Sequence, residues 1–270
     1  MLAYLYWDPN PALLPFNMPL LGRPLLWYGF LFAFGFFVAY WILRYLLLSF
    51  VSKPEAKKTA ERFTFYALVG TIVGARLGDV LFYQSWSKTV RDPLSIIKVW
   101  EGGLASHGGA LGIFIALYFL YRSYHRRFSY LRLLDLVVVP TAFVAVCIRV
   151  GNFINQEILG TVSQVPWAVI FAHPADGSPP LPRHPVQLYE ALFYLLTFAI
   201  LMLFWKTWCR REGKIAGLFF VLIFGFRFFV EFFKVEQSSL IHSALTMGQY
   251  LSIPLIALGC FLLWIKRDQR

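Results

Sequence analysis

The chain has 270 residues, of which 59% are hydrophobic and 19% aromatic, and it carries a formal net charge of +11 at pH 7. This composition excludes a water-soluble globular domain, because a soluble chain of this size does not contain so much apolar sequence. The three cysteines lie in or beside different apolar stretches and indicate neither a disulfide framework nor a zinc site.

Seven apolar stretches follow one another along the chain, each about as long as the roughly 20 residues that cross a hydrocarbon core. Lipid offers no partner to open backbone groups, and the pattern lacks the alternation of barrel strands, so each stretch is predicted to be a helix. The predicted spans are about 25–48, 63–83, 104–121, 133–151, 187–208, 215–233 and 247–265. We therefore predict an all-α polytopic membrane protein with one membrane domain, residues 1–270.

The Lys and Arg residues predict the orientation of this domain. Sixteen of the 25 lie in the connections 44–62, 122–132 and 206–214 and in the C-terminal tail, whereas six lie in the opposite connections and three within spans. Short cytoplasmic connections are the ones enriched in positive charge, so the N-terminus is predicted outside and the C-terminus inside. The net charge thus reflects topology and attraction to anionic lipid, and it does not indicate a nucleic-acid partner.

Two segments are predicted to lie on the outer side of the membrane. Residues 1–23 are rich in proline, tyrosine and tryptophan, and aromatic residues settle at headgroup level, so this segment is predicted to be a periplasmic interfacial arm. Residues 156–186 form the longest connection, rich in proline, with a strand-like run from Val165 to Phe171. Connections of this length are usually functional or disordered, and we expect a small extracytoplasmic cap over a site.

Charged groups occur within the second and third spans. Arg76 and Asp79 are three residues apart beside several glycines, and they could form a local pair or line a cavity. His107 opens the third span between two pairs of glycines, which permit close approach of another group. This histidine is either structural or a base that accepts a proton near neutral pH.

The most informative stretch ends the fourth span and reads Arg149-Val-Gly-Asn152-Phe-Ile-Asn155-Gln-Glu157. An arginine in the membrane costs from ~2.5 to more than 10 kcal/mol at the centre of an isolated helix. Such a residue is tolerated when it faces a bundle interior, a wet cavity or an anionic ligand. This stretch therefore indicates a functional site.

Further polar groups open the fifth span, from Arg183-His184-Pro185 to Glu190, and end the sixth, where Arg227 and Glu231 are spaced i, i+4 and could form a buried salt bridge. Nearly all of these groups lie in the outer halves of their spans, and one shared outward-facing polar chamber would explain them together. Several arginines beside one chamber imply an anion, and the planar guanidinium favours phosphate over a halide.

Strings along nearly the whole chain resemble the signatures of the bacterial prolipoprotein diacylglyceryl transferase family. They are Trp27-Tyr28-Gly29, Gly74-Ala-Arg76-Leu-Gly78, Gly102-Gly-Leu-Ala-Ser-His107-Gly-Gly109, Arg149-Val-Gly-Asn152 through Gly160, Arg183-His184-Pro185 through Glu190, Phe226-Arg227 through Glu231, and Gly248-Gln249 through Pro254. Each string alone is weak, but their order and spacing together are specific.

The resemblance implies an enzyme of the bacterial plasma (inner) membrane with its active site in the periplasmic half. It would transfer the diacylglyceryl group of phosphatidylglycerol to the lipobox cysteine of a preprolipoprotein, forming a thioether and releasing glycerol phosphate. Its partners would be phosphatidylglycerol, the lipobox peptide and the lipid bilayer. It would need no cofactor, and the sequence contains no metal-ligand spacing.

The resemblance and the intramembrane polar groups together give the candidate site residues. The candidate catalytic residues are His107, Arg149 and Arg227. The candidate substrate-binding residues are Arg149, Tyr28, Asn152, Asn155, Glu157, Gly160, Arg76, His184 and Glu231.

Two questions stay open at this point. The attacking thiol could lose its proton to His107, or the field of the arginines could lower its pKa. The alternative function is an organic-anion transporter with the intramembrane arginines as its substrate site, which would require access from both faces of the membrane.

Overall fold

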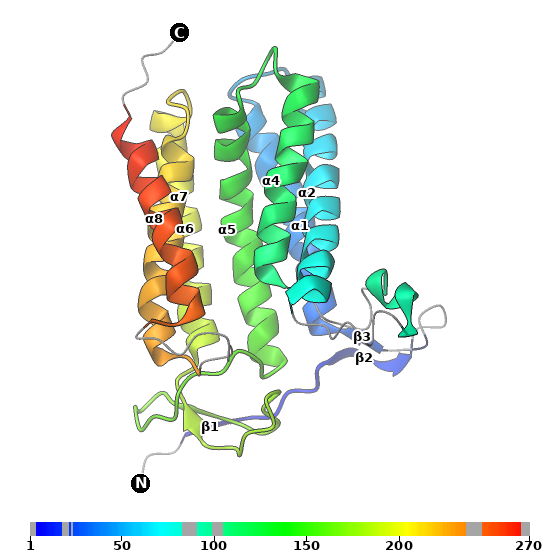
Figure 1. The fold of residues 1–270 in the computed structure, drawn as a ribbon, viewed down its shortest axis with the longest axis vertical. Helices are drawn as coiled ribbons and strands as arrows, with labels where there is room; N and C mark the ends of the chain where they lie inside the picture. Colours follow the sequence, from blue (N-terminus) through cyan, green and yellow to red (C-terminus); the bar gives the residue numbers. More distant parts are fainter. Residues whose placement is uncertain are drawn as a thin grey trace. The chain divides into compact units, whose positions relative to one another are not determined.

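The computed structural model describes residues 4–17, 22, 24–82, 91–98, 105–235 and 245–265, and of Ser106 and His107 it describes the backbone only. Within these residues, long helices form at all seven predicted places (Figure 1). They are α1 (Trp27–Leu47), α2 (Lys53–Phe82), α4 (Ser106–Tyr124), α5 (Tyr130–Ile154), α6 (Val186–Trp208), α7 (Lys214–Val230) and α8 (Met247–Trp264). The predicted helical class of the chain is thus confirmed.

Six helices of the described chain are long and apolar enough to cross a membrane: α1, α2, α5, α6, α7 with the following turn, and α8. The predicted span at α4 does not reach this hydropathy. Its first turn holds polar and glycine residues, and its last turn holds Arg122 and two tyrosines, which dilute the apolar centre. Helix α2 begins ten residues before its predicted span, because the charged residues from Lys53 onward are mostly good helix formers.

The chain divides into two compact units. The first unit comprises Met1–Ala39 and Val137–Arg270, and the second comprises Tyr40–Leu136. The single domain expected over residues 1–270 stays a prediction.

In the second unit, α2 and α4 pack closely through glycines. A Cβ on Gly74 would collide with the backbone of Gly108 and Gly112, and a Cβ on Gly70 would collide with Gly112. Small residues at such positions let two helix backbones approach each other.

In the first unit, α7 packs on both α6 and α8 (Figure 1). Gly217 and Gly259 face each other across the α7–α8 contact. The Lys214 ammonium donates hydrogen bonds to the carbonyl oxygens of Leu263 and Ile265, at 2.5 and 2.8 Å. These bonds satisfy carbonyl groups that the end of α8 leaves without helical partners.

Short strands accompany the helices of the first unit, which an all-α class did not predict. The parallel pair β1 (Leu5–Trp7) and β4 (Val169–Phe171) extends to β5 (Pro182–Arg183), and β2 (Ala12–Asn17) pairs with β3 (Pro24–Leu26). The strand expected over Val165–Phe171 forms at its last three residues only.

Trp7 holds the N-terminal arm against the end of α5. Its indole N–H donates to the carbonyl oxygen of Phe153 at 3.0 Å, and the two rings lie 4.6 Å apart. Phe153 also belongs to a buried cluster with Leu159, Val169 and Phe171. The arm and the segment after α5 therefore form one small structure.

Candidate functional site

Arg149 lies near the end of α5 with only 8% of its surface exposed. Its Nε is 3.0 Å from Oε2 of Glu190, and its Nη1 donates to Oδ1 of Asn152 at 2.9 Å. These two oxygens fix the plane of the guanidinium. The group has five N–H donors, so donors remain for a ligand even though the Tyr194 hydroxyl also interacts with it.

Glu190 is the shared counterion of the site. It is fully buried in the second turn of α6. Its Oε2 faces Arg149, and its Oε1 accepts hydrogen bonds from the Lys234 ammonium and the Tyr194 hydroxyl, both at 3.0 Å. One buried carboxylate therefore serves two cations, an arrangement that requires good geometry to offset the cost of desolvation.

Lys234 lies just beyond the helical span, after the 3-10 turn η3 (Glu231–Phe233). Its ammonium is also 3.5 Å from Oε2 of Glu231. Burial lowers the pKa of Lys234; the negative charge of Glu190 opposes this shift, and the positive charges of Arg149 and Arg227 add to it. The two arginines and the lysine are thus close enough to act on one another.

Arg227 lies in the last turn of α7 and forms no salt bridge with Glu231. The i, i+4 pair considered from the sequence is absent: the Glu231 backbone N–H still bonds the Arg227 carbonyl oxygen, but the Glu231 carboxylate lies beside Lys234 instead. Among the residues that the structure describes, no carboxylate lies within ion-pairing distance of Arg227. Within ion-pairing distance, Lys234 and Arg149 therefore share the carboxylates of Glu190 and Glu231, whereas Glu157 reaches Arg149 only through Asn152. The cluster of Arg149, Arg227, Lys234, Glu190 and Glu231 is suited to an anion.

The turn after α5 folds its polar side chains back toward Arg149. Asn152 bridges the two ends of this turn: its Oδ1 accepts from Arg149, and its Nδ2 donates to Oε1 of Glu157 at 2.7 Å. Asn155 donates to the same carboxylate oxygen at 3.4 Å, and the Glu157 carbonyl accepts from the buried Gln187 amide at 2.8 Å. The turn is therefore held by its own amides and by the start of α6.

Gly160 allows this turn to pass against the segment before α6. A Cβ at Gly160 would collide with the carbonyl oxygen and Cβ of His184. The neighbouring Thr161 N–H donates to the carbonyl oxygen of Phe233 at 2.8 Å, so the turn also pairs with the strand-like segment that carries Lys234. Only glycine fits where the turn passes against His184.

His184 takes part in a chain of hydrogen bonds. The Trp167 indole N–H donates to the Tyr189 hydroxyl at 2.7 Å, and this hydroxyl lies 3.1 Å from His184 Nδ1. Since the indole can only donate, the Tyr189 oxygen accepts from it and its proton is available to His184 Nδ1. This arrangement favours the His184 tautomer that carries its proton on Nε2.

Tyr28 contacts the same region from α1. A Cβ at Gly151 would lie 2.8 Å from a carbon of the Tyr28 ring, so the ring packs directly on the α5 backbone. The Tyr28 hydroxyl is within electrostatic reach of Glu157 and Arg149. The structure thus brings together the candidates Tyr28, Arg149, Asn152, Asn155, Glu157, Gly160, His184, Arg227 and Glu231.

Two candidates belong to the second unit. Arg76 is buried, lies 3.6 Å from Asp79, and donates to the carbonyl oxygens of Ser95 and Ile96. The local pair of Arg76 and Asp79 is therefore present. His107 lies in the first turn of α4, and its side chain is outside the described part of the chain. The catalytic role of His107 stays a prediction.

Sequence reasoning missed two members of the cluster as site residues, Glu190 and Lys234, and also Tyr194, which donates to Glu190. Gln187, Glu190 and Tyr194 follow an i, i+3, i+7 spacing, which places polar groups on one face of an otherwise apolar helix. That spacing is a signal that could have identified Glu190 and Tyr194. The sequence contains no such signal for Lys234, because a single lysine just past a span is typical of a membrane boundary.

Comparison with known proteins agrees with this geometry. Residues 15–265 match the family described as prolipoprotein diacylglyceryl transferase. A protein of Protochlamydia amoebophila named phosphatidylglycerol–prolipoprotein diacylglyceryl transferase is 51% identical over 216 residues, which cover 77% of this chain and 57% of that protein.

Proteins with the same name from Tolumonas auensis and Chloroherpeton thalassium match at full length. The Tolumonas auensis protein is 37% identical over 98% of this chain and 99% of its own length. The Chloroherpeton thalassium protein is 40% identical over 99% of this chain and 97% of its own length. The signature strings found in the sequence, the charge cluster that they form and these matches agree: the chain belongs to the prolipoprotein diacylglyceryl transferase family.

Proposed function

We propose that this protein transfers the diacylglyceryl group of phosphatidylglycerol to the lipobox cysteine of preprolipoproteins, the first step of bacterial lipoprotein maturation. Membership of the family and the names of the relatives support this activity. The observation that carries the proposal is the cluster of Arg149, Arg227 and Lys234 with the carboxylates of Glu190 and Glu231. The alternative, an organic-anion transporter, gains no support from the relatives.

In the proposed reaction the thiol sulfur attacks the glyceryl carbon that bears the phosphate, a carbon–sulfur bond forms, and the carbon–oxygen bond to phosphate breaks. The electron pair leaves with the oxygen of glycerol phosphate. Arg149 and Arg227 bind the phosphate and stabilise this growing charge, an effect worth ~3–4 kcal/mol for each preorganised donor. Lys234 adds a third cation at the same place.

The thiol proton leaves by one of two routes. His107 accepts it as a general base, or the nearby cations lower the pKa of the thiol so that water suffices. The variant His107→Ala separates these routes. Loss of activity that is recovered as the pH rises identifies His107 as the base. Full activity at every pH shows that the field of the cations lowers the pKa of the thiol without a base.

The remaining candidates hold the lipid or the groups around it. These candidates are Tyr28, Asn152, Asn155, Glu157, Gly160, His184 and Glu231, and Arg76 of α2 is proposed as a further substrate-binding residue. In this proposal α4 is a seventh crossing, the N-terminus is outside and the C-terminus inside, and the protein is a multi-pass protein of the bacterial inner membrane. The active site then faces the periplasmic half, beneath a cap formed by residues 156–186 and the arm 1–23.

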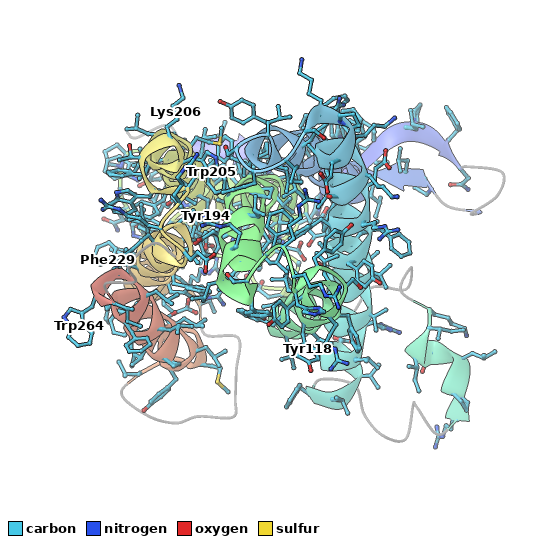
Figure 2. All side chains as sticks on the ribbon, turned by 90° about the horizontal axis from the view of Figure 1, so that it is seen from above. Tyr118, Tyr194, Trp205, Lys206, Phe229 and Trp264 are labelled. Atoms are coloured by element: carbon cyan, nitrogen blue, oxygen red, sulfur yellow. The ribbon has the colours of Figure 1, made fainter. Side chains whose placement is uncertain are left out.

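The direct test incubates the purified full-length protein with phosphatidylglycerol and a lipobox peptide and measures the peptide mass. The expected result is a shift by one diacylglyceryl group, lost in Arg149→Ala and retained in Lys206→Ala, a control in the last turn of α6 whose side chain points outward (Figure 2). Absence of the shift for the unmodified protein, with flux of an organic anion into proteoliposomes, would establish the transporter instead.

A further inference from the structure

Tyr194 is an uncharged residue that contacts the buried cluster. It lies on α6, on the side toward α5, with only 3% of its surface exposed (Figure 2). Its hydroxyl donates to Glu190 Oε1 at 3.0 Å, one helical turn away, and also interacts with the Arg149 guanidinium. The hydroxyl therefore touches both members of the Arg149–Glu190 pair.

This hydroxyl decides which oxygen of Glu190 faces Arg149. Tyr194 and Lys234 both hold Oε1, so the carboxylate presents Oε2 to the Arg149 Nε. Lys234 alone could hold Oε1 only as a point charge on a flexible stem, which does not fix the rotation of a carboxylate. A phenolic hydroxyl on a rigid ring supplies that direction without neutralising any charge of the cluster.

We propose that Tyr194 is a positioning residue for diacylglyceryl transfer: through Glu190 it orients the Arg149 guanidinium toward the phosphate of the lipid. This inference rests on the proposed function and assigns Tyr194 no contact with either substrate. A shift in guanidinium orientation weakens binding of the lipid phosphate, so the Michaelis constant for phosphatidylglycerol is the quantity that responds.

The alternative role for Tyr194 is to fill space in the core. Tyr194→Phe keeps the ring and removes only the hydroxyl. Thr197→Val is the matched control, because Thr197 is fully buried three residues further along α6 and its hydroxyl has no hydrogen-bond partner within the described chain. Both variants remove one buried hydroxyl from the same helix.

The experiment measures transfer to a lipobox peptide by the purified full-length variants, with phosphatidylglycerol and the peptide varied separately. Loss of a hydrogen bond to a charged group predicts a rise of about 10-fold in KM for phosphatidylglycerol with Tyr194→Phe. The KM for the peptide stays within error of the unmodified protein, as do both KM values for Thr197→Val. Equal effects on both KM values, or no effect on either, would overturn the positioning role.

A second variant tests the route through Glu190 and does not depend on small changes in folding. In a Glu190→Gln background, Tyr194→Phe should add nothing to the KM for phosphatidylglycerol, because the carboxylate that it orients is gone. Full additivity of the two substitutions contradicts the inference while transfer by the unmodified protein still stands. Absence of transfer by the unmodified protein refutes the proposed function itself.

Discussion

Replacing Arg149 with lysine tests the phosphate-binding role, because the substitution keeps the charge and removes the planar fork. The guanidinium holds Glu190 Oε2 through Nε at 3.0 Å and Asn152 Oδ1 through Nη1 at 2.9 Å, and it offers further donors to a phosphate. An ammonium on a shorter, flexible stem cannot serve all three directions at once. At least one hydrogen bond to a charged group is lost, at about 1.5–3 kcal/mol.

The loss in the transition state is larger, because a preorganised donor to the leaving phosphate is worth ~3–4 kcal/mol. Arg149→Lys should therefore lower kcat/KM roughly 100-fold or more, since each 1.4 kcal/mol is about tenfold. Arg149→Ala should lower it further and also destabilise the protein, because it leaves the buried Glu190 with Lys234 as its remaining ion-pair partner.

The assay is transfer of the diacylglyceryl group to a lipobox peptide, measured by mass at several phosphatidylglycerol concentrations, with thermal unfolding of each variant in the same detergent. Asn152→Asp is an informative companion, because it keeps one oxygen for Arg149 but removes the donor to Glu157. If Arg149→Lys transfers the lipid at the rate of the unmodified protein, bidentate recognition of the phosphate by Arg149 is refuted.

Three further predictions concern the surroundings of the cluster. Gly160→Ala should abolish transfer and lower the thermal midpoint, because the added methyl group collides with a backbone carbonyl; Gly225→Ala, which faces open space, should leave both unchanged. The lowered pKa of Lys234 means that its ammonium loses its proton at a lower pH than an exposed lysine. Phosphatidylglycerol binding should therefore weaken as the pH rises through the lowered pKa of Lys234, and Lys234→Arg should shift that loss upward in a titration of KM. Trp7→Ala should lower the free energy of unfolding, measured by denaturant titration, by less than the about 3–5 kcal/mol of a fully buried tryptophan, because Trp7 is partly buried, whereas the exposed Tyr6 tolerates alanine.

The helices were predictable because each depends on a continuous local stretch of sequence. A stretch of about 20 apolar residues in lipid has no other way to satisfy its backbone, so the seven helices fall close to their predicted places. The short strands depend instead on pairing between distant segments, as Leu5–Trp7 pairs with Val169–Phe171. No local pattern in a three-residue strand specifies its partner, and β1, β2, β3 and β5 were accordingly not foreseen.

In the candidate site, too, contacts between residues close in sequence were predictable, whereas contacts between distant segments were not. Arg149, Asn152 and Glu157 form a network within nine residues of sequence, and their clustering was visible in the chain itself. Lys234 joins them only because the Gly160 segment pairs with the end of α7, a contact across more than 70 residues. The i, i+4 pair of Arg227 and Glu231 was a plausible alternative from the local spacing, but the Glu231 carboxylate lies beside Lys234 instead.

The distribution of carboxylates decides whether these arginines are structural or functional. Had Arg149 and Arg227 each been paired with a carboxylate of its own, the cluster would be a set of buried ion pairs with no need of a ligand, and the phosphate proposal would fail. Instead, Glu190 divides its two oxygens between Arg149 and Lys234, and Glu231 is drawn to Lys234. Arg227 is left with electrostatic attraction to Glu190 and no ion pair among the described residues. A buried cation without its own anion is costly, and a lipid phosphate that enters the cluster supplies the missing charge.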